Sequence, residues 1–128
     1  MKHVILIFFC LLFCSCRQGS KNDWALLHEA SLHTAQPDSV MDLLGQIVRP
    51  DCLQGKARAD YALLYTEALN KQGRIGTNDS LIKIALGYYS KQAPGIPLAK
   101  SYFLLGRIYQ QQGNDTLAPV SYTHLRAH

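Results

Sequence analysis

Hydrophobic positions in the middle of the chain recur with the period of an amphipathic helix. From Val40, apolar residues follow at positions i+3, i+4, i+7 and i+8, and the same spacing recurs from Leu81. Residues 61–73 and 98–113 carry the same period, and residues 24–34 carry a weaker version of it. Because this spacing places apolar side chains on one face of a helix, each segment predicts a helix that buries one stripe.

Three copies of a short polar pattern mark where helices begin. The copies are Pro37-Asp38-Ser39-Val40, Asn78-Asp79-Ser80-Leu81 and Asn114-Asp115-Thr116-Leu117. Asp, Ser and Thr side chains accept hydrogen bonds from the unpaired N–H groups of a first helical turn, so each copy predicts a helix start. Pro, Gly and Asn in residues 49–55, 74–78 and 93–97 predict connections. No segment alternates with period two, and we therefore expect an all-α fold with five helices and the start of a sixth.

The fifth predicted helix carries a repeat signature. Its residues are Tyr102, Leu105, Gly106 and Tyr109, and Ala118 follows sixteen positions after Tyr102. This pattern resembles the signature of the tetratricopeptide repeat (TPR), W-x-x-L-G-x-x-Y…A. The resemblance implies that Leu105 and Tyr109 fill the groove between paired helices. It also implies that Gly106 and Ala118 let two backbones approach closely.

Weaker copies of this signature lie earlier in the chain. Tyr61, Leu64 and Ala68 repeat the spacing, with Tyr in the place of Gly, and a fainter copy begins at Trp24. The copies cover most of residues 24–118. The resemblance therefore implies antiparallel helix pairs that stack as a partial TPR-like α-solenoid over this range.

The N-terminus has the features of an export signal. A basic start at Lys2 precedes the apolar residues 4–13, a run too short to span a bilayer comfortably. The sequence Phe13-Cys14-Ser15-Cys16 resembles a bacterial lipobox, and this resemblance implies cleavage after Ser15 and lipidation of Cys16. We therefore expect a lipoprotein signal peptide in residues 1–15 and a lipidated cysteine with its tether in residues 16–23.

Three alternatives to this interpretation stay open: a plain cleaved signal, an uncleaved anchor, and lipidation of Cys14. Phe13 directly before Cys14 fits the cleaving peptidase poorly. Two or more acyl chains give a stable membrane anchor where one chain does not. The lipobox therefore predicts a protein anchored in the cell envelope, at the outer membrane or on the periplasmic face of a membrane.

The last nine residues do not continue the helical pattern. Residues 120–128 read Val-Ser-Tyr-Thr-His-Leu-Arg-Ala-His, which is the translation of the transposon sequencing adapter CTGTCTCTTATACACATCTCCGAGCCCAC from its third base. The first two adapter bases fit a CCT codon for Pro119. We therefore interpret residues 119–128 as a non-native tail and expect the natural gene to continue after residue 118.

Composition adds little chemistry to this outline. Without Lys2 and Arg126 the net charge of +4 falls by two, and basic residues do not alternate with aromatic ones, so we expect no nucleic-acid partner. His28 and His33 are five positions apart, which is off the i, i+4 spacing of two metal ligands on one helix face. We therefore expect surface histidines and no metal site.

Catalytic patterns are missing as well. Glu29 and Glu67 are the only glutamates and belong to different predicted helices, so an acid–base pair has no support. Cys52 lies outside the signal and the lipobox, without a family motif around it, and we expect a partly buried thiol without a role. Gly73-x-x-Gly76 lacks the strand and the Lys-Ser/Thr of a phosphate-binding loop. We expect no catalytic residue, no cofactor and no enzymatic activity.

Six tyrosines leave two interpretations open. Their side chains could line a groove in which sugars stack on the rings. More often such side chains belong to the core with the hydroxyl in water, and we prefer this interpretation. They are Tyr61, Tyr65, Tyr88, Tyr89, Tyr102 and Tyr109.

The chain as a whole resembles envelope lipoproteins of Gram-negative gut-type bacteria in its lipobox and in residues 59–64 and 78–82. In longer members of that group such repeats form the sensory half of regulators. The leading interpretation is a membrane-anchored scaffold whose concave face binds a protein or peptide, as the sensory part of an envelope signalling regulator. The alternative is a helical lipoprotein of the outer membrane that binds a glycan or another nutrient.

Overall fold

The computed structural model describes residues 21–113. In this range the chain forms five α-helices and one short 3-10 helix, without a strand, which confirms the all-α prediction. The elements are α2 (Lys21–Leu32), α3 (Pro37–Gly45), η1 (Pro50–Cys52), α4 (Gly55–Lys71), α5 (Ser80–Tyr89) and α6 (Ile96–Gln111). Cys16, the third polar pattern, Ala118 and the tail from residue 119 lie outside the described residues.

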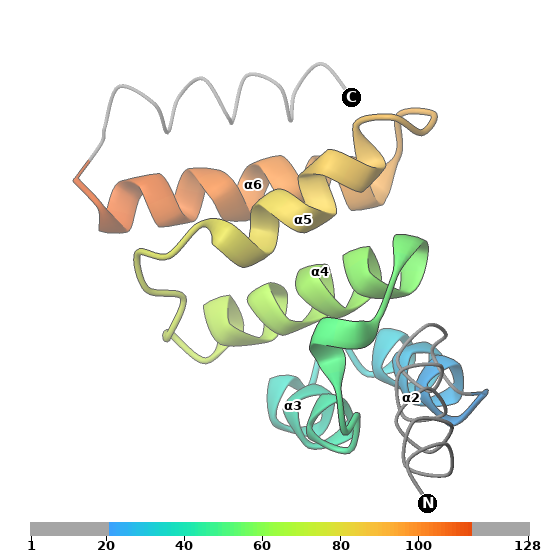
Figure 1. Ribbon diagram of the computed structural model, residues 1–128. Helices are drawn as coiled ribbons and strands as arrows, with labels where there is room; N and C mark the ends of the chain where they lie inside the picture. The colour runs from blue at the N-terminus through green and yellow to red at the C-terminus, as the bar shows by residue number, and fades with distance from the viewer. Residues whose placement is uncertain (1–20, 114–128) are drawn as a thin grey trace, which may run out of the picture.

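The helices are layered in chain order, from α2 and α3 at one end to α6 at the other (Figure 1). α2 packs on α3 and α4, α4 also packs on α3, α5 and α6, and α5 packs on α6. The chain direction alternates from α4 to α5 to α6, because each short connection turns the chain back (Figure 1). Each of these helices therefore buries its apolar face against its neighbours among the described helices.

α4 has two buried faces, and each belongs to a different core. On one face Ala57 and Leu64 pack with residues of α2 and α3. On the other face Ala59 and Ala62 pack with residues of α5 and α6. Alanine occurs on both faces, and its small side chain lets the flanking helices approach α4 closely. α4 thus joins the two halves of the described chain.

Gly73 ends α4 in a conformation that favours glycine. Its φ is +72°, its N–H donates to the carbonyl of Asn70 at 3.0 Å, and the N–H of Arg74 donates to the carbonyl of Leu69 at 2.7 Å. These two bonds form a Schellman motif, which satisfies carbonyls that the helix leaves unpaired. The predicted stop at Gly73 is confirmed, and Gly113, with φ +79°, follows α6 in the same way.

α3 and α5 begin at the predicted polar patterns, but their N-cap side chains do not cap them. Neither Gln36 nor Asp79 makes a side-chain cap bond. Asp79 instead pairs with Lys83, with 3.0 Å between Oδ2 and Nζ, and Asn78 Oδ1 accepts from the N–H of Ser80 at 2.9 Å. The pattern located both helix starts correctly, whereas the predicted capping by Asp, Ser or Thr was wrong for α3 and α5.

The predicted apolar stripe of α3 runs past the end of the helix. Because α3 ends at Gly45, Val48 does not share the buried face that the spacing gave it, and it is 88% exposed. Ile47 is buried although it lies outside the helix, and so is Leu53 in the predicted connection, which also contains η1. A helical period identifies buried positions only where the chain stays helical.

Candidate functional site

The repeat-signature residues of α4 and α6 pack in corresponding ways. Leu64 and Ala68 of α4 are buried in the core that α2 and α3 form with α4. Leu105 of α6 is buried in the core of α4, α5 and α6, and the partly buried Tyr102 and Tyr109 pack against the same core. Each signature helix therefore packs on the two helices that precede it in the chain.

Gly106 lies in the middle of α6 and is buried. An exposed glycine at this position would have had no packing role, and the match to the repeat signature would then be a coincidence. The burial of Gly106 is consistent with a packing role. The second small residue of the signature, Ala118, lies outside the described residues. The close approach of two backbones at this pair therefore stays a prediction.

A groove of about 320 Å³ opens between α2, α4 and α6, and Tyr89 of α5 reaches into it. These three helices are the first members of the successive helix pairs that the sequence predicts. A volume of this size falls at the lower end of the range of small-ligand pockets. The lining residues are Trp24, Leu27, His28, Ser31, Thr34, Lys56, Asp60, Leu63, Leu64, Tyr89, Ile96, Pro97 and Lys100.

Two large apolar side chains of this lining are exposed to solvent. Trp24 on α2 is 47% exposed, and Ile96 at the start of α6 is 73% exposed. Exposed apolar side chains beside a groove are typical of surfaces that bind a partner, because the partner removes them from water. Trp24 begins the faintest copy of the repeat signature, and the structure places it at the groove and not in the core.

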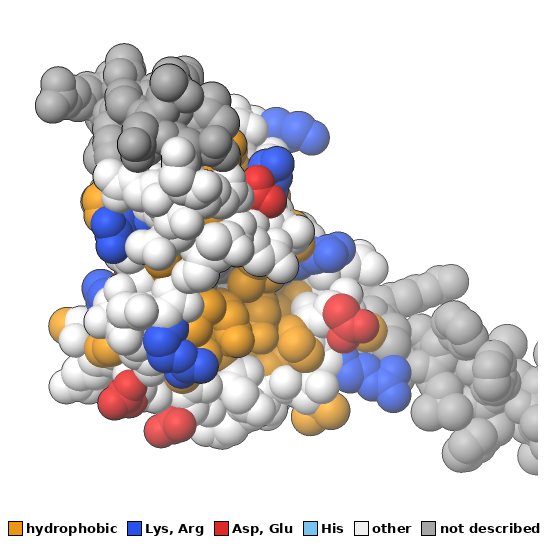
Figure 2. All heavy atoms as spheres, turned by 90° about the vertical axis from the view of Figure 1, so that its left-hand side faces the viewer, with side chains coloured by type: hydrophobic (Ala, Val, Ile, Leu, Met, Phe, Trp, Pro, Cys, Tyr) orange, Lys and Arg blue, Asp and Glu red, His pale blue; other side chains and the backbone are white. Residues whose placement is uncertain are grey.

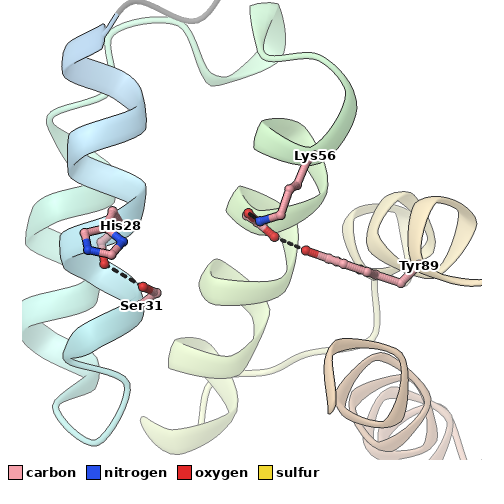
Figure 3. Close-up of polar contacts among 5 residues, drawn as sticks. His28, Ser31, Lys56 and Tyr89 are labelled. Carbon is pink, nitrogen blue, oxygen red and sulfur yellow. Dashed lines mark hydrogen bonds and ion pairs between the residues drawn. The ribbon is translucent and has the colours of Figure 1, made fainter. Parts of the chain in front are cut away.

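Hydrogen bonds join the inner wall of the groove (Figure 3). Tyr89 points from α5 toward α4, where its hydroxyl donates to Oδ1 of Asp60. The other carboxylate oxygen of Asp60 pairs with Nζ of Lys56 at 2.6 Å. Asp60 was not among the predicted site residues, although the i, i+4 spacing of Lys56 and Asp60 predicts an ion pair on a helix.

The charged groups at the groove are paired. Lys100 Nζ lies 3.0 Å from Oε2 of Glu67, in the same way that Lys56 pairs with Asp60. Burial, and next the hydrogen bond to Asp60, raise the pKa of Tyr89 far above its usual value, so its hydroxyl keeps the proton into the alkaline range where other tyrosines lose it. The groove therefore presents apolar surface around satisfied polar groups.

The α2 wall of the groove carries His28 and Ser31 (Figure 3). Ser31 Oγ donates to the backbone carbonyl of His28 at 2.5 Å, and both residues are exposed. His33 lies outside the groove and its Nε2 is 3.0 Å from Oε1 of Glu29. The two histidines do not converge, and the prediction of surface histidines is confirmed.

The six tyrosines do not form one row. Tyr61 and Tyr65 stack with 5.8 Å between ring centroids and pack against the core of α2, α3 and α4. Tyr88 meets Tyr89 edge-on at 5.0 Å, and Tyr89 is the one that lines the groove. The predicted core location is confirmed for Tyr89, which is 8% exposed, but its hydroxyl binds Asp60 and not water alone.

Residues 21–113 hold no group of three His, Cys, Asp or Glu side chains that could bind a metal ion, and Cys52 is half-buried. No helix in this range combines the length and the apolar character needed to cross a bilayer. No protein-family model, curated protein or solved structure matches the chain. Its function is therefore inferred from the groove and from the helix packing.

Proposed function

We propose that this protein is a membrane-anchored, TPR-like lipoprotein that acts as a scaffold for protein–protein interaction. The groove between α2, α4 and α6 is the surface that receives a segment of the partner. The observation that carries this proposal is the lining itself: successive first helices form one groove with exposed Trp24 and Ile96 beside it. Stacked helix pairs create such extended surfaces without catalytic chemistry.

The chemistry of the groove suits a peptide with apolar side chains. Trp24 and Ile96 offer apolar surface from two different helices. Lys56 and Lys100 are already paired with carboxylates, so the groove carries little uncompensated charge. Apolar anchors that fill a groove dominate the affinity of most protein interfaces, and the polar surroundings contribute mainly orientation.

The sole tryptophan of the chain, Trp24, provides a direct test. Peptides are selected from a random display library against the full chain in detergent, and their binding is followed by Trp24 fluorescence. Ile96→Glu should weaken binding about tenfold or more, because a charged side chain replaces an apolar anchor. Val48→Glu is the matched control, since Val48 is 88% exposed and lies outside the groove. Equal affinities for the wild type and Ile96→Glu would exclude the groove as the binding surface.

The membrane anchor is tested separately from the groove. We propose that Cys16 carries the lipid, as its place after Phe13-Cys14-Ser15 indicates. Cells grown with labelled palmitate should label the wild type, and Cys16→Ala should lose the label. Loss of the label in Cys14→Ala, with Cys16→Ala still labelled, would move the lipid to Cys14.

A glycan is the second candidate ligand, and one observation favours it. Trp24 lies in the same groove as the polar side chains of His28, Ser31 and Thr34, and sugars bind by stacking on an aromatic ring beside hydrogen-bonding groups. Calorimetric titration with oligosaccharides distinguishes the two candidates, because it does not depend on the fluorescence of Trp24, the sole tryptophan. Saturable binding of an oligosaccharide that Trp24→Phe preserves and Trp24→Ala removes would favour the glycan.

A further inference from the structure

A second cleft, also of about 320 Å³, lies at the other ends of α4 and α6. The C-terminal end of α4, the α4–α5 connection and the C-terminal part of α6 form it, and it shares no lining residue with the groove. These ends lie on the left of Figure 1. Figure 2 views the molecule from that side and shows several basic side chains there, not all of them beside an acidic one.

Two arginines line this cleft together with neutral side chains and glycines, and none of the described residues that line it is acidic. Arg107 donates through Nε to Asn70 Oδ1 at 3.3 Å and through Nη1 to Gln110 Oε1 at 2.9 Å. Arg74 donates through Nη1 to Gln72 Oε1 at 3.2 Å. A guanidinium carries five N–H donors, so these bonds to neutral amides use two donors of Arg107 and one of Arg74.

The carboxylates nearest in sequence to the cleft are engaged elsewhere. Asp79, which follows the α4–α5 connection, pairs with Lys83, and Glu67 on α4 pairs with Lys100. Within residues 21–113 neither Arg74 nor Arg107 takes part in an ion pair. Two positive charges therefore share one concave surface without a negative partner among the described residues, although like charges at one site repel.

The backbone around the cleft is held in place. Gly73 and Gly76 adopt φ values of +72° and +70°, and between them Ile75 is buried and fastens the connection to the core of α4, α5 and α6. At the other side, Gln112 Nε2 donates to the carbonyl of Thr77 at 2.8 Å and ties the end of α6 to the same connection. A β-carbon placed on Gly73 would have no atom within 4 Å, so the space beside Gly73 is open.

We propose that this two-arginine cleft binds a phosphate group, either as inorganic phosphate or as the phosphate of an anionic lipid headgroup. Guanidinium N–H groups match the oxygens of phosphate in bidentate hydrogen bonds, which are stronger than bonds to neutral amides. Arg74 follows the C-terminus of α4, where a positive charge stabilises the carbonyl ends, whereas Arg107 lies before the last turn of α6, which holds no basic residue. The helix-end effect therefore accounts for Arg74 alone and does not explain why both arginines line one cleft. A phosphate supplies the negative charge that the described lining of the cleft does not provide.

The test uses the full chain in micelles of a nonionic detergent. In one arm inorganic phosphate is titrated and binding is measured by calorimetry. In the other arm a short-chain phosphatidylglycerol is titrated into the same micelles and binding is again measured by calorimetry, because a lipid-anchored chain is in the micelle whether or not it binds the headgroup. Arg74→Gln, Arg107→Gln and the double variant are measured beside Arg58→Gln, an exposed arginine of α4 outside the cleft. Circular dichroism verifies that each variant is folded.

Saturable binding of either probe, weakened about tenfold or more by Arg74→Gln and retained in Arg58→Gln, would support the site. Arg74 is exposed, so this variant is not expected to unfold the chain. Binding in the phosphate arm identifies the free ion as a sufficient ligand, and binding in the lipid arm alone identifies the headgroup. Absence of binding in both arms, or an equal loss in Arg58→Gln, would overturn the proposal.

Discussion

Asp60 is the residue at which the groove and the core meet. Its carboxylate binds Lys56 at 2.6 Å on the same helix and accepts the hydroxyl of Tyr89 from α5. Tyr89 itself is 8% exposed and belongs to the core of α4, α5 and α6. A partly buried hydroxyl that binds a charged acceptor contributes more to stability than a bond between neutral groups. This contact therefore holds α5 in register with α4 below the groove.

We predict that Tyr89→Phe lowers the free energy of unfolding by about 1–2 kcal/mol, because the variant keeps the ring and loses the bond to Asp60. Tyr88→Phe is the matched control at the adjacent position, where the ring is partly buried and meets Tyr89 edge-on. Urea denaturation at pH 7 measures both variants. Equal stabilities of Tyr89→Phe and the wild type would show that the bond to Asp60 contributes nothing.

The same contact predicts how stability depends on alkaline pH. The pKa of Tyr89 is higher in the folded chain than in the unfolded chain, mainly through burial and also through the bond to Asp60. Above pH about 10 the unfolded state loses this proton first, so the stabilisation by Tyr89 decreases as the pH rises through that range. The ordinary tyrosine pKa is about 10. When the pH is raised from about 9 to about 11, the free energy of unfolding should therefore decrease less for Tyr89→Phe than for the wild type.

Sequence reasoning could not find the bond between Asp60 and Tyr89. The two residues are 29 positions apart, and no local spacing relates residues on different helices. The period did place Tyr89 on a buried face, because burial of that side chain follows from its helix alone. The groove was missed in detail for the same reason: its lining comes from four helices whose arrangement is set by packing.

At the scale of the helix, glycines show where the local pattern was sufficient. Gly73 ends α4 with φ +72°, a conformation in which a side chain other than hydrogen is strained. Gly87 lies inside α5, is exposed, and a β-carbon there would meet nothing within 4 Å. The predicted stop after α4 followed from glycine chemistry alone. The early end of α3 at Gly45 could not be predicted in this way, because the residues that follow Gly45 continue the apolar period.

We predict opposite effects for alanine at these two glycines. Gly73→Ala should lower the free energy of unfolding by about 1 kcal/mol, because alanine is strained at positive φ. Gly87→Ala should raise it by about 0.5–1 kcal/mol, since alanine is the better helix former. Thermal and urea melts of the two variants measure both effects. A change of the same sign in both would contradict the assignment of Gly73 to the helix stop.

Gly106 makes the repeat signature testable within α6, where it is buried. Gly106→Leu should lower stability by about 1–3 kcal/mol, because a large side chain overfills a packed site. Gly87→Leu is the control, since the space around Gly87 is open. If denaturant melts show that leucine is tolerated equally at both positions, Gly106 is not a close-packing position and the alignment with the signature is wrong there.

For the whole molecule, α4 determines how the two cores behave together. The first core joins α2, α3 and α4, the second joins α4, α5 and α6, and α2 makes no backbone contact with α5 or α6. In a chain of nearest-neighbour contacts, stability is transmitted only through the shared helix. The predicted stripe of α4, with Leu64 and Ala68, matches the first core, whereas Ala59 and Ala62 belong to the second core. One helical period describes one buried face, so the second face of a helix shared by two cores was not predicted.

We predict that the described helices unfold as one unit because neither core keeps its partner once α4 is lost. Ile82 of α5 is fully buried in the second core. Trp24, the sole tryptophan, lies on α2, which contacts α3 and α4 but not α5. Ile82→Val should lower stability by about 0.5–1.5 kcal/mol through the lost methyl group, and the same shift should appear in Trp24 fluorescence and in far-ultraviolet circular dichroism. Val48→Ala, at an exposed position, should shift neither signal. Separate midpoints for the two probes, with the fluorescence midpoint unmoved by Ile82→Val, would mean that the core of α2 and α3 unfolds independently of α5 and α6.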